Sequence, residues 1–220
     1  MKPYVTFQSL TFALLFLPTS IVDAGFVTYS NRAAWESTVG NHSTEDFNSF
    51  TVDTPFHTNA VDVGDFSLSM TGDPGTVRNK IDVPNLWDSS FNIDGTNVAS
   101  VFLKTGDSLF LIFDAAIVSF GAEFAALNDS VRRVDIVVAG EVFTPPVTAA
   151  SQVRFFGFTS DVSFTSVELR GVGTFNDGFS LDNVSFSEQA PVPEPASLAM
   201  WGLGAIVLTG YSRRKRKLAA

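Results

Sequence analysis

The sequence predicts an all-β protein: a jelly-roll-like β-sandwich with one short N-terminal helix, joined to a C-terminal single transmembrane helix. Three observations lead to this fold class. Short apolar–polar alternations recur between residues 25 and 188, with turn residues about every 8–14 positions. Hydrophobic residues make up 45% of the 220-residue chain and 22 of its residues are Phe, which is enough for a sizeable core. Two further apolar runs lie at the chain ends, outside this pattern.

Residues 1–24 have the composition of a secretory signal peptide. Lys2 supplies the positive start, residues 10–17 form the apolar stretch, and Val22 and Ala24 lie at positions −3 and −1 of a cut before Gly25. The apolar stretch is too short to span ~30 Å of hydrocarbon. The alternative, a buried N-terminal helix, explains the charged start and the small residues less well.

Residues 25–189 are expected to form the β-sandwich domain. Alternation and β-branched or aromatic enrichment predict strands at 65–70, 98–103, 108–113, 134–138, 152–158, 166–169 and 178–186. In the first of these, Phe66, Leu68 and Met70 fall on one face. The alternation of the last strand shifts at Asp182–Asn183, which predicts a β-bulge there.

One helix is expected in this domain, at Asn31–Glu36. Asn31 is a good N-cap residue, the residues after it favour helix, and Gly40 is a stop signal. The helix is expected to place Ala34 and Trp35 against the sheet.

The C-terminal end has three consecutive parts. Residues 190–195 form a Pro-rich linker that contains Pro193-Glu194-Pro195, and residues 196–212 form an apolar segment at the lower length limit for a membrane span. A basic tail, 213–220, follows. By the positive-inside rule its charged cluster is a membrane stop signal on the cytoplasmic side, made of Arg213, Arg214, Lys215, Arg216 and Lys217. A core helix would not be expected to end in such a cluster.

This tail resembles the PEP-CTERM sorting signal of Gram-negative bacteria, on residues 192–197, 201–204 and the basic end. The resemblance implies an exosortase as partner, a membrane transpeptidase that cuts at or near the Pro-Glu-Pro motif. It also implies a precursor held in the inner membrane and then passed to the cell envelope or the extracellular space, in a host that makes exopolysaccharide.

The central domain is also similar to the globular part of many PEP-CTERM proteins. The matching stretches are 26–35, 45–47, 155–161, 164–167 and 177–184. The resemblance implies a jelly-roll sandwich akin to carbohydrate-binding modules.

The charge of the domain limits its partners. The chain carries a net charge of −9, but residues 25–190 hold 8 Lys and Arg against 21 Asp and Glu, a net charge of −13. Such a domain repels nucleic acid and attracts cations such as Ca²⁺. The chain has no Cys and two His, which excludes disulfides, Cys-ligated zinc and thiol catalysis.

A structural Ca²⁺ is expected because oxygen ligands gather in two stretches. Glu45 and Asp46 lie early in the domain, and Asp177, Asp182 and Asn183 lie on or beside the last strand, which can be a neighbour of the first in a jelly roll. The alternative is that these side chains only cap turns. The loop 88–97 fails the EF-hand register and is interpreted as a turn at Asp94–Gly95.

The domain carries no recognisable catalytic motif, so we expect no enzyme activity. Trp87, in a polar loop, is the candidate for stacking on a sugar ring. The sequence thus favours an exported envelope or extracellular-matrix protein that is a non-catalytic glycan-binding or structural module associated with exopolysaccharide. The alternative is an extracellular polysaccharide-active hydrolase, in which two carboxyl groups flank the scissile bond.

Overall fold

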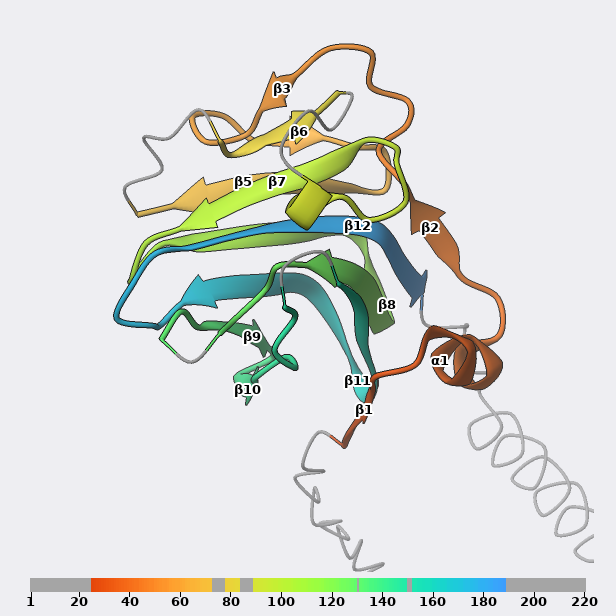
Figure 1. Cartoon of the computed structure of the whole chain (residues 1–220). Coiled ribbons are helices and arrows are strands. Elements are labelled where there is room, and N and C mark those ends of the chain that lie inside the picture. The colour runs from red at the N-terminus through yellow and green to blue at the C-terminus, as the bar shows by residue number, and fades with distance from the viewer. Residues whose placement is uncertain (1–24, 73–77, 84–88, 130, 150–151, 189–220) are drawn as a thin grey trace, which may run out of the picture.

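The computed structural model describes residues 25–72, 78–83, 89–129, 131–149 and 152–188 (Figure 1). Strands dominate these residues and one short α-helix accompanies them, so the all-β prediction is confirmed. The predicted signal peptide, Pro-rich linker, membrane segment and basic tail lie outside the described residues, as does Trp87. In the described part of the chain, no helix has the length and apolar character that a membrane span requires.

The elements follow one another from the N-terminus in the order shown in Figure 1. Their bounds are β1 (Phe26–Tyr29), α1 (Arg32–Val39), β2 (Ser43–Glu45), β3 (Thr54–Pro55), β4 (Val61–Asp62), β5 (Phe66–Thr71), β6 (Lys80–Asp82), the 3₁₀-helix η1 (Ser89–Phe91), β7 (Val98–Leu103), β8 (Ser108–Ala125), β9 (Val134–Val138), β10 (Glu141–Phe143), β11 (Val153–Gly171) and β12 (Asp177–Glu188).

Two long strands, β8 and β11, belong to both halves of the sheet. The first half of β8 pairs with β5 and with the second half of β11, and the second half of β8 pairs with the first half of β11 and with β12. The register of β11 against β8 shifts between Thr159 and Ser166, which is where the strands bend. One half therefore has the order β4-β5-β8-β11-β9-β10, and the other β1-β11-β8-β12-β7-β6-β3.

The two halves of the sheet share one apolar core, as in a sandwich. Period-two alternation turns one side of each strand inward. In β5, Phe66 and Leu68 are buried, while Ser67 and Ser69 are half-buried and Met70 packs at the edge of the core. Most of the largest buried side chains are Phe, so the abundance of Phe in the sequence is accounted for by the core.

The predicted helix is present and spans Arg32–Val39. The Asn31 side chain accepts a hydrogen bond from the Ala34 N–H at 3.0 Å, and the Gly40 N–H donates to Glu36 at the other end. Trp35 is fully buried and its ring N–H donates to the Phe158 carbonyl. Ala34 was expected against the sheet but is exposed instead. Trp35 is the buried residue of this helix, and Ala34 lies on the part of the helix surface that faces solvent.

The predicted bulge in β12 is confirmed. The register of β12 against β8 shifts between Asp182 and Ser185, and Asn183 has a left-handed φ of 50°. The shift lets side chains of opposite parity, Leu181 and Val184, both point into the core. β2 pairs with this end of β12, with Glu45 opposite Val184, so the early acidic stretch does lie beside the last strand.

Candidate functional site

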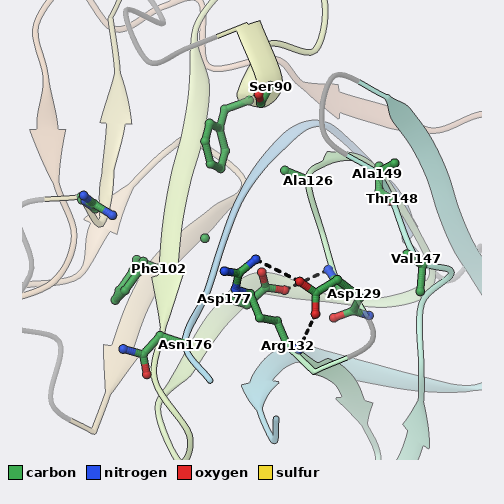
Figure 2. Close-up of a pocket in the computed structure, with 14 residues that line it drawn as sticks. Ser90, Phe102, Ala126, Asp129, Arg132, Val147, Thr148, Ala149, Asn176 and Asp177 are labelled. Carbon is green, nitrogen blue, oxygen red and sulfur yellow. Dashed lines mark hydrogen bonds and ion pairs between the residues drawn. The ribbon is translucent and has the colours of Figure 1, made fainter. Parts of the chain in front are cut away.

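A hollow of about 550 Å³ opens at the start of β12 (Figure 2). It is lined by residues from η1, β7, the turn after β8, the segment before β11, and the first residues of β12. Segments far apart in the sequence therefore meet here, because β12 lies between β8 and β7 in the sheet.

Asp177 is the buried carboxyl group of this hollow. Its Oδ2 accepts a hydrogen bond from the Asn128 N–H at 2.8 Å, and the residue is 3% exposed. Burial raises the pKa of Asp177 to about 6, and the nearby Asp129 carboxylate adds to the rise, while the Asn128 N–H opposes it. Asp177 therefore holds a proton at mildly acidic pH, unlike an exposed aspartate.

Asn128 fixes the turn that carries the opposite wall. Its side chain accepts from the Val134 N–H at 2.6 Å and donates to the carbonyls of Val134 and Pro145. Asn128 itself has a left-handed φ of 62°, a conformation that Asn adopts more readily than most residues. The Asn128 side chain thus holds the turn through hydrogen bonds to backbone groups, and this fixes the positions of Asp129 and Arg132.

Asp129 and Arg132 form the charged rim of the hollow. Asp129 accepts from the N–H groups of Arg132 and Val131, and these contacts hold the pKa of Asp129 below its usual value. The Arg132 Nη1 lies 2.9 Å from Asp129 Oδ2, yet its side chain remains 53% exposed. Guanidinium N–H groups therefore stay available to a ligand next to a carboxylate.

Aromatic rings form the facing wall. Phe102 on β7 stands across the hollow from Asp129 (Figure 2). The Phe91 ring lines the same wall, and both rings flank Gly178, where an added Cβ would lie 3.4 Å from Phe102 and 3.9 Å from Phe91. Beyond the rim, Phe175 is 59% exposed and directly precedes the lining residues Asn176 and Asp177. The hollow thus combines apolar ring surface with hydrogen-bonding and charged groups.

The predicted metal residues fall into two groups. Asp177 lies in the hollow, where Asp129 and Arg132 are the charges that act on it. Asp182 lies at the bulge, where the charges of Asp94, Asp46 and Glu123 act on it instead. Among the described residues, no three Asp, Glu or His side chains are grouped closely enough to hold a metal ion. The expectation of Ca²⁺ itself stays a prediction.

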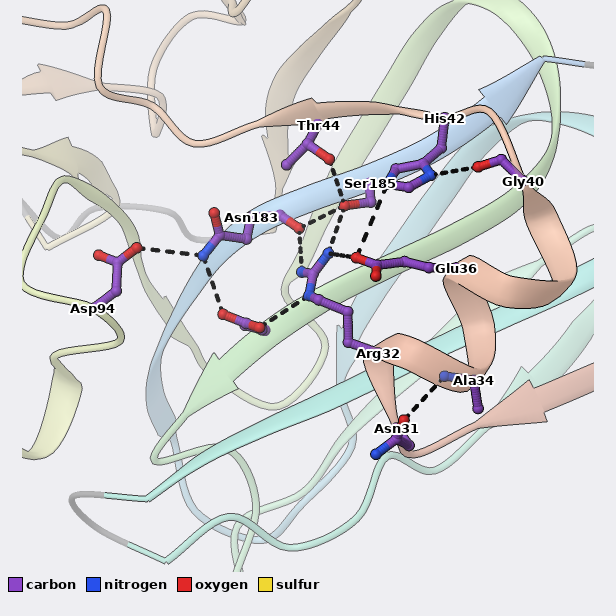
Figure 3. Close-up of polar contacts among 11 residues, drawn as sticks. Asn31, Arg32, Ala34, Glu36, Gly40, His42, Thr44, Asp94, Asn183 and Ser185 are labelled. Carbon is purple, nitrogen blue, oxygen red and sulfur yellow. Dashed lines mark hydrogen bonds and ion pairs between the residues drawn. The ribbon is translucent and has the colours of Figure 1, made fainter.

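Around the bulge, Arg32 on α1 ties several groups together (Figure 3). Its guanidinium donates to Glu123 Oε1 at 2.9 Å, to the Ser185 hydroxyl at 2.8 Å and to the Asn183 carbonyl at 2.8 Å. The Asn183 side-chain amide donates to Glu123 Oε2 at 3.0 Å and lies 3.5 Å from Asp94 Oδ2. Glu45, also predicted as a ligand, accepts from the Phe47 N–H.

Sequence reasoning missed the rim residues Asn128, Asp129 and Arg132, and also Arg32 and Glu123. One signal was present: Arg132–Arg133 is the one pair of adjacent basic residues between positions 25 and 190, in a domain that is otherwise strongly acidic. Arg32 and Glu123 carried no such signal. Glu123 lies opposite Asp182 only because β8 pairs with β12, and Arg32 contacts Glu123 only because α1 packs beside these strands.

An all-β domain followed by a C-terminal sorting signal defines the class of this protein. Residues 191–217 match the family model of the PEP-CTERM protein-sorting motif, so the chain carries this motif, as expected from the resemblance of its tail. The motif implies an exported protein that an exosortase processes. No curated protein matches the sequence.

Two kinds of solved structure are similar to the fold. The K2 cleaved adhesin domain of Lys-gingipain is 13% identical, with a TM-score of 0.45, over 67% of this chain and 99% of that domain. The catalytic unit of a GH87 α-1,3-glucanase from Streptomyces thermodiastaticus is 11% identical, with a TM-score of 0.32, over 71% of this chain and 27% of the glucanase chain. A GH87 catalytic domain in complex with nigerose gives 11% identity and a TM-score of 0.32, over 77% of this chain and 30% of that one.

Proposed function

We propose that this chain is a non-catalytic, saccharide-binding module of the cell envelope or extracellular matrix that binds exopolysaccharide through the hollow at the start of β12. The observation that supports this most is the pairing of a ring wall, Phe91 and Phe102, with a charged rim, Asp129 and Arg132. Sugar rings present apolar C–H faces and polar edges, so a mixed surface of this kind suits them.

The remaining expectations from the sequence belong to the same proposal. Residues 1–24 direct export, and residues 196–212 hold the precursor in the inner membrane, with the basic tail on the cytoplasmic side. The exosortase then cuts at or near Pro193-Glu194-Pro195 and releases the domain. The jelly-roll-like topology and the acidic domain, which repels nucleic acid, fit a role among neutral polysaccharide chains outside the cell.

The exposed Arg132 side chain, which lines the hollow, offers a direct test of binding. Full-length protein in a mild detergent is titrated with a panel of bacterial polysaccharides, and both binding and released sugars are measured. Binding without product is expected, and Arg132→Ala is expected to weaken it about 3- to 10-fold, which is the range for loss of one hydrogen-bonding contact. Val142→Ala, an exposed residue on β10, is the matched control and should bind as the wild type does.

One observation favours a hydrolase as the second candidate. Asp177 and Asp129 line the same hollow, and their pKa values move in opposite directions, which is the pattern of an acid–base pair. Release of sugars by the wild type and its loss in Asp177→Asn would establish the hydrolase and overturn the non-catalytic proposal. Neither binding nor product from any polysaccharide would leave a purely structural role.

A further inference from the structure

Phe175 is an exposed aromatic ring at the edge of the hollow. Among the Phe, Trp and Tyr residues whose side chains the structure describes, it is the one that is exposed, at 59%. The other described rings are buried or half-buried, and most of them belong to the core. A single exposed apolar residue needs no explanation by itself, so the position of this ring decides what it can do.

Phe175 lies directly beside two residues that line the hollow. Its backbone forms a parallel β-bridge with Arg132, and residues paired in this way present their side chains on the same side of a sheet. Arg132 lines the hollow, and its charge acts on Asp177 inside it. Asp177 begins β12 two positions after Phe175, which in an extended chain corresponds to about 7 Å and to the same face. The ring therefore emerges on the side of the hollow, at a distance comparable with the length of a sugar unit.

The segment that carries Phe175 is held in place by the neighbouring turn. The N–H groups of Val172 and Gly173 both donate to the Arg133 carbonyl, at 2.9 and 3.0 Å. The Thr105 hydroxyl donates to the Gly173 carbonyl. A Cβ added at Gly173 would lie 2.5 Å from the Arg133 nitrogen, so the two segments are in contact through their backbones. Because the ring is presented on a fixed frame, little conformational entropy is lost when a ligand covers it.

We propose that the Phe175 ring is a second sugar-contacting surface, on which one sugar of a polysaccharide stacks while a neighbouring sugar of the same chain occupies the hollow. This inference rests on the proposed function and specifies its ligand, which is a chain of consecutive sugars and not a single sugar. The ring packs against the apolar C–H face of a sugar, while Arg132 and Asp129 at the rim form hydrogen bonds with hydroxyl groups.

A second copy of this chain fits the surface less well than a saccharide does. One aromatic side chain buries about 150–250 Å², whereas a stable protein interface buries about 800 Å² on each partner. The net charge over residues 25–190 is −13, so two copies of the domain repel each other, whereas an uncharged saccharide is not repelled. Size and charge therefore both favour a neutral saccharide chain as the occupant.

The test compares the affinities of short and long fragments of one saccharide. The polysaccharide that binds best in the panel is partially hydrolysed, and its fragments, from the single sugar to longer oligosaccharides, are separated by size. Full-length protein, in a mild detergent without a sugar headgroup, is titrated with each fragment by calorimetry. The affinity of the wild type should rise with the number of sugars and then level off, because longer fragments reach from the hollow to the ring.

Variants at Phe175 separate the two contacts. Phe175→Ala should lower the affinity for the longer fragments about 3- to 10-fold and leave the affinity for the single sugar unchanged, because only the stacked contact is lost. Phe175→Tyr keeps the flat ring and should bind as the wild type does. Val27→Ala, at a similarly exposed apolar residue on β1, is the matched control and should also bind normally. All three changed side chains are exposed, so the melting temperature should stay at the wild-type value.

The outcomes distinguish this inference from the proposed function. The inference is overturned if Phe175→Ala binds every fragment as the wild type does, or if it weakens all fragments, the single sugar included, by the same factor. In both cases weaker binding by Arg132→Ala would still support the hollow as a saccharide site. Absence of binding of every fragment by the wild type would overturn both proposals. Self-association of the wild type that Phe175→Ala abolishes, measured by analytical ultracentrifugation, would overturn the inference and identify a second copy as the occupant.

Discussion

Asp177 and Asp182 lie on the same strand and both are buried, yet their surroundings differ. Asp177 has a backbone donor, the Asn128 N–H, and faces a hollow with Arg132 nearby. Asp182 has a donor on one oxygen and, among the described residues, none on the other, and the charges that act on it are those of acidic residues. Burial is therefore common to the two aspartates and raises the pKa of both, and their neighbours decide how far it rises, to about 6 for Asp177 and about 8 for Asp182.

The raised pKa of Asp177 predicts a pH dependence of stability. The pKa is about 6 in the folded state and 3.8 in the unfolded state, so the folded state binds the proton more tightly. This contribution is fully present below pH 4 and is lost as the pH rises through 6, by up to about 3 kcal/mol. Urea unfolding of wild type and Asp177→Asn between pH 4 and pH 8 measures it. The difference in free energy of unfolding should change across this window, and parallel curves would contradict the prediction.

At the scale of the elements, α1 is attached to the sheet through one large side chain. Trp35 is fully buried, donates to the Phe158 carbonyl at 3.2 Å and packs beside Phe155 with ring centroids 5.9 Å apart. Arg32 from the same helix donates to Glu123 and to the Asn183 carbonyl, so α1 also contacts the bulge of β12.

Trp35→Ala should therefore destabilise the domain by about 3–5 kcal/mol, as expected when a large buried aromatic is truncated. The hydrogen bond to Phe158 is lost as well, which places the loss towards the upper end of that range. Chemical denaturation followed by circular dichroism measures the change. Ala34→Ser, on the exposed side of the same helix, should change stability by less than about 0.5 kcal/mol, and an equal loss in both variants would contradict the anchoring role.

Local signals predicted the helix at Asn31, the strand at Phe66 and the bulge at Asp182. Helix capping, apolar–polar alternation and a shift of that alternation each depend only on residues close together in the sequence. The predicted strands 152–158 and 166–169 are instead one strand, β11, and 108–113 is the first third of β8. Short strands such as β2 and β6 were missed, since they depend on a partner rather than on their own sequence.

The residues of the candidate sites also divide into those with a local sequence signal and those placed only by tertiary contacts. The sequence singled out Asp177 and Asp182 as oxygen-bearing side chains on or beside the last strand, and Asp182 also because it interrupts the alternation there. The sequence did not single out Arg132, because it lies at the hollow through tertiary proximity to β12. Loop–strand contacts of this kind leave no periodic pattern in the sequence, so the hollow could not be predicted, whereas the early acidic stretch was expected beside β12 and does lie there.

At the scale of the whole molecule, the folded domain and the sorting motif have separate tasks. The domain ends its last strand at Glu188, and the motif begins at residue 191, so the sorting signal follows the fold almost directly. Replacing Pro193-Glu194-Pro195 by three alanines should leave a precursor of unchanged mass in the membrane fraction, because the exosortase loses its recognition element. Wild-type processing of this variant, seen by electrophoresis of fractionated cells, would contradict the assignment of the cleavage signal.

Saccharide binding at the hollow at the start of β12 can be located residue by residue. The most direct measurement is a titration of isotope-labelled, full-length protein with the polysaccharide that binds best in the panel, followed by backbone amide chemical shifts. If the hollow binds saccharide, the amide signals of Phe102, Asp129, Arg132 and residues 175–178 should shift, and those around Asn183 at the far bend of the strand should not. Shifts confined to other surfaces, or none with any polysaccharide, would contradict it.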